Sequence, residues 1–146
     1  MFVNSLVSQR AYTALEIYEL CLAVTAAGGL FRFHADGASM APTLPGGAQV
    51  VLRTLSATPP LGAIVLGLID GKIVLHRVLW RKAERVLLAG DANLYLDGWV
   101  ERQDLAGVVT QWQTAGRTTC VTTARSLRGW LIALLRHGRR TFFKGR

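Results

Sequence analysis

The spacing of apolar residues divides the chain into a helical start, a β-rich middle and a helical end. Residues 8–27 carry apolar side chains three and four positions apart, which predicts a helix, and Gly28-Gly29 would end it. Alternating and β-branched runs further on predict strands at residues 30–34, 49–53, 64–68, 73–80, 85–89 and 104–112. Asp70-Gly71, between two of these runs, is a strong hairpin signal. We therefore predict a mostly antiparallel β core over residues 30–112, in which residues 90–99 form a loop.

Helical spacing returns after the last predicted strand. From Ser126 onward, one helical face would carry the apolar side chains Leu127, Trp130, Leu131, Leu134 and Leu135. Arginines flank that face at positions 125, 128, 136, 139 and 140. Ser126 is a candidate amino-terminal cap and Gly138 a candidate stop. Residues 125–146 are therefore predicted to form a basic amphipathic helix and tail, which ends in Thr141-Phe142-Phe143-Lys144.

The composition indicates a single folded domain over residues 1–146. Hydrophobic residues make up 51% of the chain and charged residues 18%, which suits a mostly β fold with flanking helices and a real core. No segment has the roughly eighteen consecutive apolar residues of a spanning helix. Glu16 and Glu19 occupy the place where a signal peptide would be apolar. Cys21 and Cys120 form no metal-type spacing or disulfide framework, so we expect two small buried side chains in a cytoplasmic protein.

The net charge of +8 is concentrated at the carboxyl end. Residues 1–104 contain nine Lys/Arg and nine Asp/Glu, whereas residues 105–146 contain eight Lys/Arg and no acid. Trp130 and the two terminal phenylalanines beside clustered arginines suit peripheral contact with an anionic membrane. A helix that packs its leucine face on the β core and leaves its arginines in solvent is equally well supported, and the two interpretations are compatible. Nucleic-acid binding ranks lower, because stacking aromatics on a sheet face are not evident.

The amino-terminal helix would cover one side of the domain or close an oligomer contact.

The residue types needed for acyl transfer occur in separate turn and strand segments. Ser39, in a glycine-flanked turn, is the candidate nucleophile, and a serine hydroxyl requires a base. Histidine is the usual base near neutral pH; His76, on a predicted strand, is chosen, whereas His34 is interpreted as an exposed strand residue. Asp91 and Asp97, on the loop after the next strand, are both candidates to orient His76. Each of these residues also has a structural explanation as a turn or strand residue, so the hypothesis depends on the ordered set.

That ordered set resembles a known family. The chain carries, in this order, Ser-Met-x-Pro-Thr-Leu at 39–44, Leu-Gly-Ala-Ile-Val at 61–65, Val-Leu-His-Arg-Val at 74–78, Ala-Gly-Asp-Ala-Asn at 89–93 and Leu-Ala-Gly-Val-Val at 105–109. These segments resemble the conserved boxes of the serine peptidases that include type I signal peptidases and the self-cleaving domains of SOS-type repressors. The likeness spans residues 37–109, half of the chain, and is greatest to the anchorless bacterial relatives of the Ser-His type.

The resemblance implies the antiparallel β fold of that family and a role for each candidate residue. Ser39 would be the nucleophile and His76 the general base. Asp97 would orient His76, while Asp91 would shape the loop or share that role. The backbone N–H of Ser39 would donate to the oxyanion. No cofactor and no metal are implied.

Two functions follow from the sequence. The first is a serine endopeptidase that cleaves a peptide or protein tail through an acyl-enzyme on Ser39. The resemblance alone implies a small side chain next to the scissile bond. The second is a non-catalytic peptide- or membrane-surface-binding module of the same fold. Gly37 motivates the second, because many signal peptidases have a serine at that position. So does Pro45-Gly46-Gly47-Ala48, where the family usually continues Gly-Asp.

Overall fold

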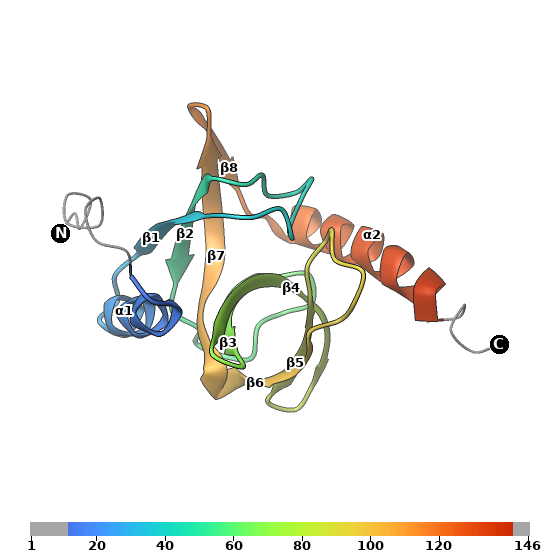
Figure 1. The fold of residues 1–146 in the computed structure, drawn as a ribbon, viewed down its shortest axis with the longest axis horizontal. Coiled ribbons are helices and arrows are strands. Elements are labelled where there is room, and N and C mark those ends of the chain that lie inside the picture. The colour runs from blue at the N-terminus through green and yellow to red at the C-terminus, as the bar shows by residue number, and fades with distance from the viewer. Residues whose placement is uncertain (1–11, 142–146) are drawn as a thin grey trace.

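The structure, a computed structural model, describes residues 12–141 and the side chains of residues 12–138. It consists of one curved sheet with a helix at either end (Figure 1). The elements in chain order are α1 (Ala14–Ala26), β1 (Phe31–Ala35), β2 (Ala48–Arg53), β3 (Ile64–Ile69), β4 (Lys72–Lys82), β5 (Arg85–Ala89), β6 (Gly98–Glu101), the 3-10 turn η1 (Arg102–Asp104), β7 (Leu105–Thr114), β8 (Arg117–Cys120) and α2 (Thr123–Thr141). The predicted mostly β fold with flanking helices is thereby confirmed.

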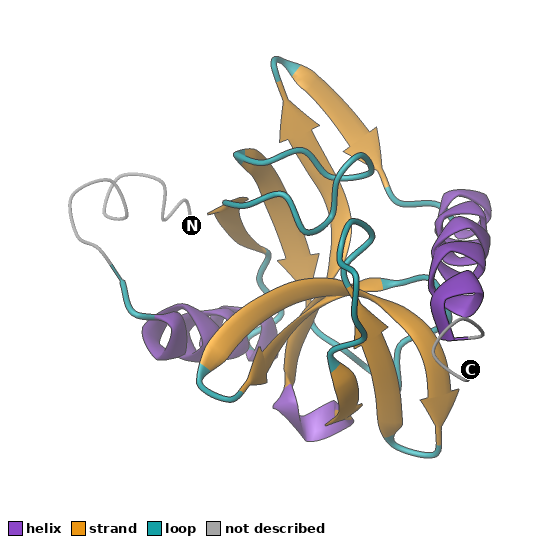
Figure 2. Ribbon diagram, turned by 45° about the vertical axis from the view of Figure 1, so that its right-hand side comes forward, coloured by secondary structure: helices purple, strands orange, loops and turns teal. Residues whose placement is uncertain are grey.

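Every strand pairing in the sheet is antiparallel. The strand order is β1-β2-β7-β3-β4-β5-β6, and β8 pairs with β7. Figure 2 shows the sheet bending, with the β7–β8 hairpin projecting from one end. The predicted hairpin at Asp70-Gly71 joins β3 to β4, and both residues have positive φ, 50° and 74°. Such a pair of positive φ angles is what a tight two-residue hairpin turn requires.

Two strands were not predicted. β6 begins at Gly98, inside the segment predicted as loop, so the loop prediction over residues 90–99 is wrong at its end. The strand forms because it pairs along β5, with Leu88 opposite Gly98 and Leu87 opposite Trp99. β8 is polar and forms by pairing with the end of β7. In both cases the partner strand, rather than local periodicity, produces the extended structure.

α1 is shorter than predicted and ends where predicted. It begins at Ala14, and residues 8–11 lie outside the described residues. Thr13 and Glu16 form a reciprocal capping box, in which each side chain accepts a hydrogen bond from the backbone N–H of the other residue. At Gly28-Gly29 both N–H groups donate to carbonyls of the last turn, with a φ of 81° at the first glycine, which closes the helix.

The predicted ends of α2 are wrong. Ser126 lies inside the helix rather than at its cap, and the Thr122 hydroxyl accepts a hydrogen bond from the Arg125 N–H at 3.2 Å. Gly138 does not stop the helix, because it keeps a negative φ and the helix continues to residue 141. The rest of the predicted tail, residues 142–146, lies outside the described residues. Neither helix of the described chain combines the length and apolar character needed to cross a bilayer.

The face by which α2 packs also differs from the prediction. Its inner face consists of Trp130, Ala133 and His137, and the Trp130 indole N–H donates to the Leu79 carbonyl at 2.7 Å. The larger aliphatic side chains stay exposed by 48–57%: Leu127, Leu131, Ile132 and Leu135. The helix therefore packs on the sheet through Trp130, as predicted, and Leu134 is half-buried, whereas Leu127, Leu131 and Leu135 are exposed. The physical reason is that Gly129 sits directly against a guanidinium group of the sheet, where a larger residue would not fit.

The hydrophobic core has two main clusters. One lies between α1 and strands β1, β2, β3 and β7, and the other lies among β3, β4, β5, β6 and β7. Cys21 of α1 is fully buried in the first cluster. Cys120 is exposed at the end of β8, so the prediction of two buried cysteines is wrong for this one.

Candidate active site

Ser39 lies on the loop between β1 and β2, which is anchored from both sides. The neighbouring side chains Met40 and Leu44 are buried in the core. Gly37, with a φ of 94°, turns the chain just before Ser39. The Ser39 carbonyl accepts a hydrogen bond from the Ala92 N–H at 2.8 Å. This bond ties the Ser39 loop to the loop between β5 and β6.

His76 lies on β4, in the interior of the sheet. The strand is paired with β3, where Val65 is opposite His76, and with β5 on its other side. The His76 side chain is buried. Its Nε2 lies 3.0 Å from Ser39 Oγ, and its Nδ1 lies 2.6 Å from Asp97 Oδ2. The imidazole therefore bridges two loops that are far apart in the sequence.

Asp97 is the last residue before β6. Its N–H donates to the Leu88 carbonyl at 2.9 Å, which continues the β5–β6 ladder by one bond. The carboxylate is largely buried and faces His76. The pairing of β6, which was not predicted, therefore determines where this carboxylate lies.

The three side chains form a continuous hydrogen-bonded chain. Because a carboxylate only accepts hydrogen bonds, the Nδ1–H of His76 donates to Asp97. Nε2 is then the acceptor for the Ser39 hydroxyl, the arrangement in which a histidine can take the proton of an attacking serine. Ser39 is half-buried, while Gly37 and Ala38 before it are exposed. The hydroxyl therefore lies next to open surface.

One backbone donor is available for a negatively charged oxygen. Within residues 12–141, the N–H of Ser39 has no hydrogen-bond acceptor. Gly37 adds no hydroxyl, and a Cβ built at that position would meet nothing within 4 Å. The Ser39 N–H can therefore donate to an oxyanion, whereas position 37 supplies no second donor from a side chain.

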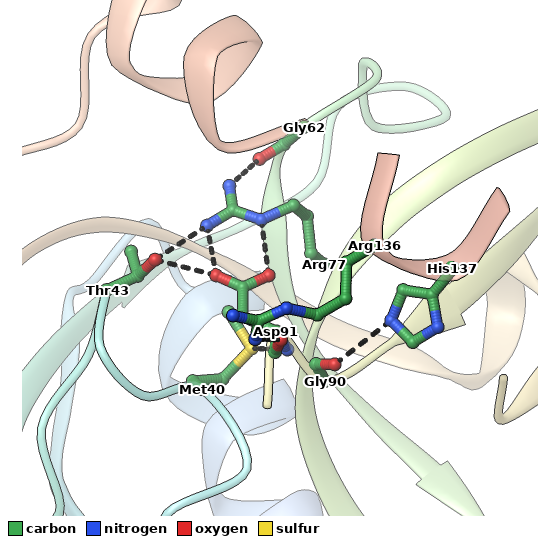
Figure 3. A network of polar contacts seen from close by, with 8 residues as sticks. All are labelled: Met40, Thr43, Gly62, Arg77, Gly90, Asp91, Arg136 and His137. Carbon is green, nitrogen blue, oxygen red and sulfur yellow. Dashed lines mark hydrogen bonds and ion pairs between the residues drawn. The ribbon is translucent and has the colours of Figure 1, made fainter. Parts of the chain in front are cut away.

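Asp91 does not contact His76 but lies in a second, buried polar cluster (Figure 3). Arg77, the residue after His76, binds the Asp91 carboxylate in a bidentate pair with two N–O distances of 2.7 Å. The Thr43 hydroxyl donates to the same carboxylate at 2.7 Å, and Arg77 also donates to the Gly62 carbonyl at 2.9 Å. The Asp91 carboxylate therefore binds Arg77 and, through Thr43, the Ser39 loop.

α2 closes this second cluster from outside the sheet. Figure 3 shows Arg136 and His137 of α2 beside the Asp91 backbone, with Arg136 donating to the Asp91 carbonyl. His137 is buried and its Nε2 lies 3.4 Å from the Gly90 carbonyl. The start of the β5–β6 loop, whose other end carries Asp97, is therefore held by α2.

The structure brings Ser39, His76 and Asp97 together and separates Asp91 from them. His34, interpreted as an exposed strand residue, is exposed on β1, and its Nδ1 lies 3.3 Å from the Gly47 carbonyl.

The sequence interpretation missed the buried partners Arg77, Thr43, Arg136 and His137. A charged residue inside the apolar strand 73–80 was a usable signal for Arg77, because a buried arginine needs an acid. The α2 partners had no local signal.

Within residues 12–141, no group of three or more His, Cys, Asp or Glu side chains could hold a metal ion. Comparisons of the chain with models of protein families, with curated proteins and with solved structures find no match. The function of the chain is therefore inferred from the geometry of the site and the motifs that form it.

Proposed function

We propose that the protein is a serine endopeptidase with a fold of the signal-peptidase and SOS-repressor type and a Ser-His-Asp site like that of the anchorless Ser-His relatives. The observation that carries the proposal is the continuous hydrogen-bonded chain from Asp97 through His76 to Ser39. Single residues of these types are common in turns and strands. Their assembly at 2.6 and 3.0 Å, from three separate segments, is what nucleophilic catalysis needs.

The first step forms an acyl-enzyme. Ser39 Oγ attacks the scissile carbonyl carbon while its proton moves to His76 Nε2, and Asp97 stabilises the imidazolium. The carbonyl oxygen becomes an oxyanion that accepts a hydrogen bond from the Ser39 N–H. When the C–N bond breaks, Nε2 returns the proton to the departing amine.

The second step releases the enzyme. Water attacks the ester carbonyl and gives a proton to His76 Nε2. The Ser39–acyl bond then breaks, Ser39 Oγ recovers that proton, and the carboxylic acid leaves.

An extended peptide or protein tail is the proposed substrate class. β1, which leads directly into the Ser39 loop, stands at the end of the strand order and pairs only with β2 among the described strands. Its other edge can accept a substrate strand by backbone hydrogen bonding. A peptide added there would run alongside Gly37 and Ala38, which are exposed.

Covalent labelling tests the proposal. A serine-directed covalent probe is expected to add once to the wild-type protein, and peptide mapping should place the adduct on Ser39. Ser39→Ala should show no adduct. His76→Gln should label at least about a thousandfold more slowly, because the base is lost while the serine remains. Ser56→Ala, which removes an exposed loop serine, is the matched control and should label like the wild type.

Equal labelling of the wild type and Ser39→Ala would contradict the assignment. A wild type that takes no label but binds an extended peptide would support the alternative, a non-catalytic binding module of the same fold. The feature that favours this alternative is Gly37, which supplies no second oxyanion donor from its side chain.

A further inference from the structure

The outward face of α2 combines large apolar side chains with arginines. Leu127, Leu131 and Leu135 follow one another at four-residue spacing, and Ile132 lies beside them; all four are exposed by 48–57%. At this spacing the three leucines form a stripe of about 12 Å along the helix. Monomeric soluble domains seldom leave such a contiguous apolar stripe open to water.

The ionisable groups around this stripe carry one sign. Arg128 is exposed and lies one helical turn from Leu131 and Ile132. Arg125 and Arg136 are exposed as well, with guanidinium groups that donate to the Cys120 and Asp91 carbonyls. α2 contains five arginines and no acidic residue. The outward face therefore presents apolar side chains and positive charge together.

The inner contacts hold α2 in this orientation. Trp130 is bonded to the Leu79 carbonyl, and Arg136 and His137 contact the backbone of Asp91 and Gly90. Figures 1 and 2 both show α2 along one end of the molecule, away from α1. The stripe therefore cannot turn inward without breaking these bonds, and an extended surface can reach it from outside.

We propose that the outward face of α2 docks the protein onto an anionic membrane surface. The leucines would enter the boundary between headgroups and acyl chains, while the arginines, with their long aliphatic stems, would reach anionic headgroups. Charge complementarity favours this partner over a second copy of the chain, because pairing two such faces would bring like charges together. The proposal is independent of peptidase activity.

Vesicle binding by the full-length protein tests this inference. We expect binding to vesicles of phosphatidylcholine with phosphatidylglycerol, little binding to pure phosphatidylcholine, and weaker binding as salt is raised. Leu131→Gln/Leu135→Gln should lower the partition coefficient at least about tenfold through the loss of apolar insertion. Arg128→Gln should lower it about fivefold. Ser39→Ala should bind like the wild type, which separates this test from that of the peptidase site.

Leu15→Gln/Leu30→Gln is the matched control. Leu15 and Leu30 are exposed by 50% and 53%, close to the values for Leu131 and Leu135, but lie on α1 and just before β1. This variant should bind like the wild type. Circular dichroism and thermal unfolding should be unchanged in both double variants, because all four side chains are already exposed.

Four results would overturn the proposal. In the first, the wild type would not bind anionic vesicles. In the second, the control variant Leu15→Gln/Leu30→Gln would lose as much vesicle binding as Leu131→Gln/Leu135→Gln. In a third result, the wild type would not bind vesicles but would self-associate in sedimentation experiments, and Leu131→Gln/Leu135→Gln would abolish this association. The outward face of α2 would then be assigned to contact with a second copy of the chain. In a fourth result, the wild type would not bind vesicles but would bind RNA, and the leucine changes would not affect RNA binding. The arginines would then be assigned to nucleic-acid binding.

Discussion

His76 and Arg77 are neighbours on β4, yet they bind different carboxylates of the same loop. His76 contacts Asp97, at the end of the β5–β6 loop, and Arg77 contacts Asp91, at its start. The first pair leads to the Ser39 hydroxyl, whereas the second is enclosed by protein groups. The two aspartates should therefore differ in what their loss does.

Asparagine at the two positions tests this difference. Asp97→Asn should lower the labelling rate of Ser39 by about 10²- to 10⁴-fold, because the amide no longer fixes the tautomer of His76. Its free energy of unfolding should change by no more than about 1 kcal/mol, because the amide has the same shape. Asp91→Asn should instead lower the free energy of unfolding by about 3–5 kcal/mol, because the buried Arg77 charge is left unpaired.

Urea unfolding and labelling kinetics, measured on both variants, give the comparison. If Asp91→Asn slows labelling of Ser39 without lowering the free energy of unfolding, Asp91 acts with Ser39 and His76. The proposed separation of roles between the two aspartates would then be wrong.

The two cysteines should differ in reactivity. Burial raises the pKa of the Cys21 thiol to about 12, so its reactive thiolate is scarce at neutral pH. Cys120 is exposed. Iodoacetamide at pH 8 should therefore alkylate Cys120 in the native protein and leave Cys21 unmodified, as peptide mass spectrometry would show. Modification of Cys21 at a comparable rate would mean that the core under α1 opens readily.

At the scale of elements, α2 is joined to the site by close packing as well as by hydrogen bonds. A Cβ at Gly129 would lie 2.5–2.7 Å from the Arg77 guanidinium. That group is fixed by Asp91 and the Gly62 carbonyl, so it cannot swing aside. The absent side chain at Gly129 is therefore what lets α2 approach β4.

Two glycines of the same helix give a matched test of this packing. Gly129→Ala should destabilise the protein by about 1–3 kcal/mol through overpacking, although alanine is the better helix former. Gly138→Ala should stabilise it by about 0.5–1 kcal/mol, because a Cβ there meets nothing within 4 Å.

Thermal and urea unfolding of both glycine variants would measure these changes. Equal stabilisation by Gly129→Ala and Gly138→Ala would show that α2 is not in close steric contact with Arg77.

On the scale of the whole molecule, the excess positive charge and the candidate catalytic groups are separated. The positive excess lies in residues 105–146, while the Ser39, His76 and Asp97 side chains come from residues before them. α2 links the two regions, because it contains five of the arginines and its Arg136 and His137 contact the β5–β6 loop. Docking through α2 would therefore fix the orientation of the site relative to the bound surface.

Local features of the sequence determined most of the elements. Period-two and β-branched runs predicted β1 to β5 and β7, and Asp70-Gly71 predicted the hairpin, because strand alternation and turn conformation depend on neighbouring residues. The candidate residues Ser39 and His76, and the charge of the carboxyl end, were also readable from the sequence.

Only the tertiary structure decided between the two aspartates and between the faces of α2. Asp97 reaches His76 because β6 pairs with β5 in one register, and Asp91 is taken by Arg77; neither follows from spacing along the chain. The predicted inner face of α2 contained Trp130 and four leucines. Trp130 does face the sheet, but its bond and the close approach of Gly129 leave Leu127, Leu131 and Leu135 exposed. Periodicity shows which residues share a face, whereas the partner surface determines which face is buried.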